Sequence, residues 1–372
     1  MGEDKDAVPP LILLIFRQPC TAIDNPCGKC YHQTKYNRIF LAAEKEDFSM
    51  KVFVTGGTGN IGQHVTLALA QRGHQVELLT RTPERIPAFQ TMENVHVVKG
   101  CLQEPETMTA ALQGCDAVIH IALGWGVTPE EMMMNDTRVT AILLDAAEQA
   151  GVKNFIYTSS TAAAGDLHDG MDETGLRAPT DLYGATKAAT EVYLMGFRQY
   201  YSRKGGYGDK VRMRRNVIRP GYTFSSPAVP GGASQSDKRF QNIAEAIVEG
   251  RDLTFPAGDG TQFLSSRQIA QVYVQLVESD LNEEIFYALG DKFITWYEIA
   301  CMAKDMTPGC QSRITAEGEK GQPNLYCVDK IDRVFGLRFD GGDDLREHIQ
   351  WNLERAKAKL AGETLHDPVH SY

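Results

Sequence analysis

Three glycines follow a short apolar run and precede an amphipathic one, and this arrangement constrains the fold more than any other feature of the chain. The glycines are Gly56, Gly59 and Gly62. The run before them, Val52–Thr55, is predicted to be a strand, and the run after them, Ile61–Arg72, a helix. A tight turn from strand to helix needs a positive φ, and a pyrophosphate approaches the backbone closely only where no Cβ intervenes. Since a helix N-terminus adds unpaired N–H groups, the loop is predicted to bind nucleotide phosphates.

Beyond the glycine loop, β-rich runs alternate with amphipathic helical runs. The predicted strands are Val52–Thr55, Val76–Thr80, Val95–Lys99, Ala117–Ala122, Phe155–Ser159 and Asn216–Arg219. The predicted helices between them are Ile61–Arg72, Glu106–Leu112, Glu130–Gln149 and Asp181–Tyr201. Because strands joined by helices of this length form right-handed crossovers, we expect a parallel sheet covered on both faces, in strand order 3-2-1-4-5-6. This is a Rossmann-like, doubly wound α/β fold.

The alternation ends after Pro220, where Pro- and Gly-rich loops separate shorter elements. We therefore predict a nucleotide-binding domain over residues 50–222 and a small C-terminal lobe, mainly substrate-binding, over residues 223–372. The short apolar run Ile285–Leu289 is assigned to that lobe. Residues 1–49 combine Pro, Cys and charge without sustained periodicity, so we expect an N-terminal extension outside the core, with Met50 as the original start of the chain.

Composition restricts the partners of the chain. It has 372 residues and a formal net charge of −10, which argues against nucleic acid or an anionic membrane as the main partner. No apolar run reaches the roughly 18 residues that a transmembrane helix needs. Eight cysteines are too few for a disulfide scaffold at this length, so a reduced, cytoplasmic protein is expected. Cys20, Cys27, Cys30 and His32 resemble half of a zinc site, but a second ligand pair is missing, so no metal is predicted.

The end of the second predicted strand indicates which nucleotide is bound. Sites for NAD usually place a carboxylate there, on the ribose 2′-OH. In this chain the strand ends in Thr80, and Arg81 and Arg85 follow. A guanidinium can bind a 2′-phosphate through two parallel hydrogen bonds. We therefore predict NADP(H), with Arg81 as a contact, and keep NAD(H) as the alternative.

A tyrosine and a lysine four residues apart, Tyr183 and Lys187, are candidates for acid–base chemistry. On a helix they share a face, and the ammonium favours the phenolate, which lowers the tyrosine pKa toward neutrality. The Y-x-x-x-K spacing occurs four times in the chain, but only here does it follow a predicted inner strand that ends in hydroxyls, Thr158–Ser160. Ser160, at this edge of the sheet, can hydrogen-bond a substrate oxygen while Tyr183 exchanges its proton.

Together these motifs resemble an extended short-chain dehydrogenase/reductase of the NAD-dependent epimerase/dehydratase family. The resemblance covers roughly residues 50–290 and is carried by Thr55–Gly62, Asp116–Ala122, Thr158–Ser160, Tyr183–Lys187 and Arg219–Gly221. It implies that Ser160, Tyr183 and Lys187 are catalytic and that Lys187 also binds the nicotinamide ribose. The other cofactor contacts that it implies are Gly56, Gly59, Asn60, Ile61, Gly62 and Ala122.

Two positions depart from the family pattern. The family often has Gly-Asp-Leu after the third strand, where this chain has Gly100, Cys101 and Leu102. A thiol is a weak acceptor, so we expect Cys101 and Leu102 to bind adenine through backbone groups. Phe263 and Leu264 stand about where sugar-nucleotide epimerases often place an arginine for the diphosphate, which weakens the sugar-nucleotide interpretation.

These residues support three functions. The favoured one is an NAD(P)-dependent oxidoreductase that moves a hydride to or from the carbonyl or alcohol carbon of a small or hydrophobic substrate. The second is a nucleotide-sugar epimerase or dehydratase with tightly bound NAD. The third, a non-enzymatic NAD(P) sensor, is disfavoured because the Ser/Tyr/Lys set is complete. A small molecule is the expected partner, and a homodimer is left open.

Overall fold

The computed structural model describes residues 49–201, 207–235 and 237–363. The predicted extension, residues 1–49, lies outside these ranges except for Ser49, and so does the group Cys20, Cys27, Cys30 and His32. Among the helices of the described ranges, none is both long and apolar enough to cross a membrane.

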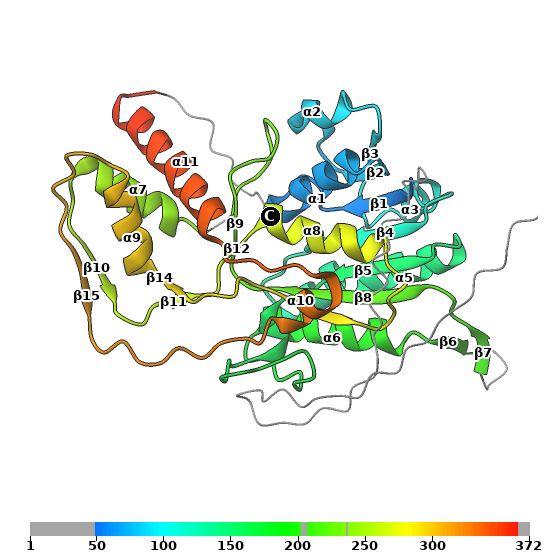
Figure 1. Ribbon diagram of the computed structural model, residues 1–372. Helices are drawn as coiled ribbons and strands as arrows, with labels where there is room; N and C mark the ends of the chain where they lie inside the picture. Colours follow the sequence, from blue (N-terminus) through cyan, green and yellow to red (C-terminus); the bar gives the residue numbers. More distant parts are fainter. Residues whose placement is uncertain (1–48, 202–206, 236, 364–372) are drawn as a thin grey trace, which may run out of the picture. The chain divides into compact units, whose positions relative to one another are not determined.

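Seven strands form one sheet in the order β13-β8-β5-β4-β1-β2-β3 (Figure 1). They are β1 (Lys51–Thr55), β2 (Gln75–Thr80), β3 (Val95–Lys99), β4 (Ala117–His120), β5 (Asn154–Thr158), β8 (Arg214–Pro220) and β13 (Ile285–Ala288). Every neighbouring pair is parallel. The first six strands have the predicted order, so the Rossmann-like α/β fold is confirmed.

Both faces of the sheet are covered, which explains why its central strands β1, β4 and β5 are buried almost throughout. The covering helices include α1 (Asn60–Gln71), α5 (Arg138–Gln149), α6 (Leu182–Gly196) and α8 (Ser266–Val277). Side chains of β1 alternate between the two faces. Val52 and Val54 join the core that contains α1 and α8 residues, whereas Phe53 joins the core that contains α5 and α6 residues.

The C-terminal part of the chain returns to this sheet. β13 pairs with β8 as a seventh strand, and α8 packs against α1 (Figure 1). A division at residue 222 therefore does not separate the two parts of the chain cleanly, because α8 and β13 belong to the Rossmann layers. Four apolar residues such as those of β13 are too short a pattern to show which sheet they join.

The C-terminal lobe has a core of its own, rich in aromatic side chains. It contains α7 (Arg239–Glu249), α9 (Trp296–Asp305), α11 (Gly342–Leu360) and the strand pair β10 (Leu253–Pro256) and β15 (Ile314–Glu317). Phe240, Phe263 and Trp296 contact one another edge to face, with ring centroids 5.0–5.9 Å apart. Phe263 and Leu264 are therefore packing residues of buried segments.

Two predicted helices differ from those observed. The helix predicted over Asp181–Tyr201 ends at Gly196, and β6 (Gln199–Tyr201) then pairs with β7 (Tyr207–Lys210). The helix predicted over Glu130–Gln149 consists of α4 (Pro129–Met132), a π-helical turn (Met133–Thr137) and α5. The remaining elements are α2 (Pro87–Gln90), α3 (Pro105–Ala111), α10 (Asp329–Phe335), β9 (Thr223–Phe224), β11 (Gly260–Thr261), β12 (Leu264–Ser265), β14 (Ile294–Thr295) and the 3₁₀ turns Pro83–Arg85 and Thr161–Ala164.

Candidate active site

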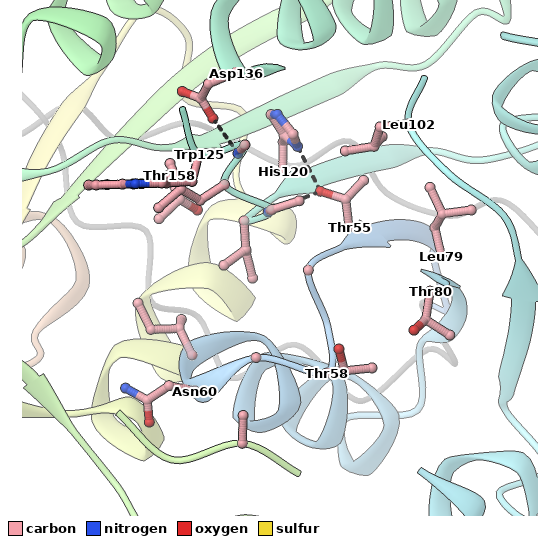
Figure 2. A pocket seen from close by; sticks show the side chains of 18 of the residues that line it. Thr55, Thr58, Asn60, Leu79, Thr80, Leu102, His120, Trp125, Asp136 and Thr158 are labelled. Carbon is pink, nitrogen blue, oxygen red and sulfur yellow. Dashed lines mark hydrogen bonds between the residues drawn. The ribbon is translucent and has the colours of Figure 1, made fainter. Parts of the chain in front are cut away.

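A cavity of about 1070 Å³ lies at the carboxyl ends of the sheet strands, the edge at which parallel sheets bind ligands. Segments that follow β1, β2, β3, β4, β5 and β8 form its wall. Figure 2 shows part of this wall, with Thr55, His120 and Asp136 on one side. The predicted site residues that line the cavity are Gly56, Gly59, Asn60, Ile61, Arg81, Cys101, Leu102, Ala122, Ser160, Tyr183 and Lys187.

The glycines of the loop allow a tight turn from β1 into α1 and leave the N-terminus of α1 without a side-chain cap. Gly56 has φ +70°, and a Cβ there would lie 2.5 Å from the Ala122 nitrogen. A Cβ on Gly62 would lie 2.0 Å from the Gly56 carbonyl oxygen, so Gly62 lets α1 approach the loop and is not itself a lining residue. Gly59 is the N-cap of α1, which has no side-chain cap. The N–H groups of the first turn therefore remain suited to binding an anion.

Tyr183 and Lys187 come from the first two turns of α6. The helix begins after Asp181, whose Oδ1 accepts a hydrogen bond from the Gly184 N–H at 2.6 Å. Lys187 Nζ lies 5.9 Å from the centre of the Tyr183 ring, so the two side chains share one face as their spacing predicts. Tyr183 is half-buried, whereas Lys187 is buried.

Ser160 follows β5 and begins the 3₁₀ turn Thr161–Ala164. Its Oγ accepts a hydrogen bond from the Ala162 N–H at 3.2 Å, which leaves the hydroxyl proton for another acceptor. A Cβ on Gly184 would lie 2.4 Å from the Ala162 carbonyl oxygen, so this turn approaches α6 closely. The close approach brings the Ser160 segment beside the segment that carries Tyr183.

A buried carboxylate that the sequence analysis missed, Asp136, pairs with Lys187. Lys187 Nζ lies 3.4 Å from Asp136 Oδ2, and the Gly124 N–H donates to Asp136 Oδ1 at 3.1 Å (Figure 2). Burial alone lowers the pKa of Lys187, but Tyr157 and Asp136 more than offset it, so the pKa of Lys187 is raised. The ammonium therefore stays charged.

The sequence did contain a signal for Asp136. Met132, Asp136, Thr140 and Leu143 recur at helical spacing and are all buried. A carboxylate on the apolar face of an amphipathic helix needs a partner, because an unpaired buried charge is costly. Asp136 lies in the π-helical turn, a distortion that is frequent at functional sites.

His120, at the end of β4, is part of a buried hydrogen-bond chain. Its Nδ1 lies 2.7 Å from Thr55 Oγ1, and its Nε2 lies 2.9 Å from Thr140 Oγ1. Because the Thr140 hydroxyl donates to the Asp136 carbonyl oxygen at 2.8 Å, its oxygen accepts the Nε2 proton. Burial, with a smaller contribution from Lys187, lowers the pKa of His120 to about 3, so the ring is a neutral structural link.

The end of the cavity where the sequence predicts the adenosine lies beyond β2 and β3. Arg81 and Arg85 are exposed and line it. Cys101 and Leu102 also line it, after Gly100, whose N–H donates to the Thr80 carbonyl at 3.0 Å. The Arg81 side chain thus lies at the end of β2, where the sequence predicts a contact with a 2′-phosphate.

The segment Ser225–Gln235 crosses the glycine loop, which no sequence pattern indicates. Ser225 Oγ donates to Asn60 Oδ1 at 2.5 Å, and the Ala228 N–H donates to Gln63 Oε1 at 2.7 Å. The Ala233 N–H donates to the Thr58 carbonyl at 3.3 Å. The side chain of Asn60 therefore binds this segment, which leaves its backbone to contact a phosphate.

The chain is similar to curated proteins with different activities. It is 33% identical over 161 residues to the 3-beta-hydroxysteroid dehydrogenase of Mycolicibacterium neoaurum, a match that covers 39% of this chain and 43% of that protein. It is 38% identical over 130 residues to the UDP-glucose 4-epimerase of Klebsiella pneumoniae, a match that covers 32% of this chain and 94% of that protein. The chain thus spans less than half the length of the steroid dehydrogenases that it matches.

Solved structures share the fold. The UDP-glucuronic acid 4-epimerase from Bacillus cereus in complex with NAD aligns with a TM-score of 0.65 at 18% identity, over 83% of this chain and 99% of that chain. The family model described as the NAD dependent epimerase/dehydratase family matches residues 52–288. This range exceeds half of the chain and contains the glycine loop, Ser160, Tyr183 and Lys187. The chain therefore belongs to the NAD-dependent epimerase/dehydratase family, which confirms the resemblance carried by its motifs.

Proposed function

We propose that this chain is an NADP(H)-dependent oxidoreductase acting at the carbonyl or alcohol carbon of a small or hydrophobic substrate. The observation that carries the proposal is that Ser160, Tyr183 and Lys187 share one cavity with the glycine loop. The similar curated proteins include dehydrogenases and epimerases, which supports an enzyme over a nucleotide sensor.

Each polar group has a distinct task in this reaction. A bound nicotinamide would supply the hydride donor or acceptor. Ser160 donates a hydrogen bond to the substrate oxygen and orients it. Tyr183 gives that oxygen a proton during reduction and takes it back during oxidation. Lys187 stabilises the negative charge that then forms on the Tyr183 oxygen, and Asp136 holds the ammonium in place.

The choice of NADP(H) rests on the end of β2. Arg81 and Arg85 line the cavity there, and a guanidinium suits a 2′-phosphate. The carboxylate of β2, Glu77, pairs with Lys51 at 3.0 Å and with His96 at 2.6 Å. These two partners hold the Glu77 carboxylate away from the predicted ribose-binding position. A cytoplasmic location and a small-molecule partner stay predictions.

The test of the reaction is Tyr183→Phe, which removes the proton donor and keeps the ring. We expect turnover to fall about 10²–10⁴-fold, with NADPH binding nearly unchanged. The matched control is Tyr193→Phe, an exposed tyrosine on the same helix, which should leave turnover unchanged. Unchanged turnover in Tyr183→Phe would refute the assignment.

An epimerase with tightly bound NAD is the second candidate. The match to the Klebsiella pneumoniae epimerase, which spans 94% of that protein, favours it. Purification without added nucleotide distinguishes the two candidates. Retained NAD supports the epimerase, whereas weakly held, exchangeable NADPH supports the reductase.

A further inference from the structure

Trp125 lines the cavity, yet about half of its surface (51%) is exposed. Its ring centroid lies 6.2 Å from that of Tyr183, at an interplanar angle of 35°. Figure 2 shows it on the same side of the cavity as Asp136 and Thr158. An indole offers a large apolar face, and leaving much of it in water forgoes the free energy that burial provides.

The backbone around Trp125 is held firmly, so a loose loop does not explain the exposure. Asn135 Nδ2 donates to the Trp125 carbonyl at 2.8 Å, and the Gly124 N–H donates to Asp136 Oδ1 at 3.1 Å. A Cβ on Gly124 would lie 1.9 Å from the Asn135 carbonyl oxygen, so the loop lies directly against the π-helical turn. Asp136 thus fixes both the Trp125 loop and Lys187.

Exposed apolar side chains continue from Trp125 along the neighbouring segments. They are Val127 on the same loop, Met133 and Met134 in the π-helical turn, and Leu182 at the start of α6. The π-helical turn packs against α6, so these residues come from adjacent segments. They extend the apolar surface next to Trp125 beyond the residues that line the cavity, and the exposed Glu130 and Glu131 lie among them.

The cations that line the cavity either lie at the end of β2 or are already paired. Among the described residues that line the cavity, the basic ones are Arg81, Arg85 and Lys187. The two arginines lie at the end of β2, and Lys187 pairs with Asp136. None of the three is left to neutralise phosphates on a substrate beside Trp125.

The lobe side of the cavity adds a carboxylate. Asp237 lines the cavity and pairs with Arg239 at 2.7 Å. Arg267, three residues after Leu264, forms ion pairs with Asp344 and Glu347. Among the described residues that line the lobe side of the cavity, none is a lysine or arginine, so a diphosphate would find no cation there.

We propose that the Trp125 ring is a stacking surface for an uncharged, flat, fused-ring substrate whose carbonyl or hydroxyl group lies at Tyr183. This inference rests on the proposed function. Trp125 contacts the ring system of the substrate and so determines specificity, and it takes no part in the proton or hydride transfer. Stacking on a preorganised indole favours flat ring systems over small ketones.

The kinetic test compares two ketones with the NADPH-saturated enzyme: 2-tetralone, with two fused rings, and cyclohexanone, with one. We expect Trp125→Ala to raise the KM for 2-tetralone about tenfold more than the KM for cyclohexanone, with the kcat values changing less. Trp125→Phe should restore most of the preference. Trp351→Phe, in α11, is the control expected to leave both ketones unaffected. Equal effects on both ketones would overturn the proposal.

A binding test separates this inference from the proposed function. The chain has three tryptophans, and Trp125 is the one that lines the cavity. With NADP⁺ bound, 2-tetralone should quench tryptophan emission in the wild type and in Trp351→Phe, and should not do so in Trp125→Phe. Quenching by UDP-glucose without quenching by 2-tetralone would overturn the stacking surface. Turnover that survives in Tyr183→Phe would instead overturn the proposed function and leave the quenching result standing.

Discussion

Two residues of α6, Lys187 and Glu191, lie one turn apart, and each forms a buried ion pair with a different role. Lys187 meets Asp136 through a single contact of 3.4 Å at the cavity wall. Glu191 meets Arg219 through two contacts, 2.8 Å to Nε and 2.6 Å to Nη2, in the interior. All four side chains are almost completely buried. Burial therefore does not distinguish the pair that we propose takes part in the reaction from a structural one, whereas geometry and access to a cavity do.

The Glu191–Arg219 pair belongs to a hydrogen-bond network that holds α6 in place. Arg177 Nε also donates to Glu191 Oε2 at 2.7 Å, and Arg219 Nη1 donates to the Tyr287 hydroxyl at 3.2 Å. Burial alone raises the pKa of Glu191, but Arg219, with smaller contributions from Ser159 and Arg177, more than offsets it, so the pKa of Glu191 is lowered. The network ties α6 to β8, to β13 and to the segment before α6. It fixes the helix that presents Tyr183 and Lys187.

The largest expected effect comes from breaking this anchor. Glu191→Gln leaves the Arg219 guanidinium buried without its counter-charge, which costs about 3–5 kcal/mol in the free energy of unfolding. Urea denaturation measures the loss. Arg198→Gln is the control: its pair with Glu283 is equally short, 2.6 Å, but Arg198 is 66% exposed, so the expected loss is at most about 1 kcal/mol. A loss below about 1 kcal/mol in Glu191→Gln would show that the anchor is dispensable.

Asp136→Asn tests the pair at the cavity wall. The amide oxygen can still accept the Gly124 N–H, but Lys187 loses its counter-charge, so we expect a stability loss of about 1–3 kcal/mol. The uncompensated ammonium favours an anionic oxygen beside it, so the rising limb of the pH–rate profile for alcohol oxidation should move to lower pH by about one unit. Asp145→Asn is the control expected to leave the profile in place, because the Asp145 carboxylate accepts a hydrogen bond from the Tyr200 hydroxyl. A limb that does not move would mean that Asp136 does not tune the reaction, and a move to higher pH would mean that Asp136 acts by keeping Lys187 charged.

The two pairs also mark how far sequence patterns carry. Tyr183 and Lys187 are four residues apart on one helix, and the glycine loop is a contiguous strand–turn–helix unit, so local rules are enough to place them together. Asp136 and Lys187 are 51 residues apart, and Glu191 and Arg219 are 28 apart. No local rule pairs such residues, because the fold must first bring β8 and the π-helical turn to α6.

Other features escaped prediction for different physical reasons. β13 is an edge strand of four residues, and its apolar pattern fits a sheet or a lobe equally well. Trp125 lies in a loop without periodicity, so its place beside Tyr183 depends on contacts with the π-helical turn. The segment Ser225–Gln235 reaches the glycine loop through bonds to side chains on α1, which composition does not encode.

Arg81 completes the comparison as an exposed cation, and its removal should have the smallest effect. Arg81→Ala should leave the free energy of unfolding within about 0.5 kcal/mol of the wild type, because surface substitutions rarely do more. If Arg81 binds the 2′-phosphate, the KM for NADPH should rise about tenfold, which corresponds to about 1.4 kcal/mol of lost binding free energy. The KM for NADH should stay nearly constant, because NADH has no 2′-phosphate. Arg72→Ala, at the C-terminal end of α1, is the control for a lost surface arginine. Parallel changes in both KM values would contradict the preference for NADP(H). Such a result would not bear on the roles assigned to the two buried ion pairs of α6.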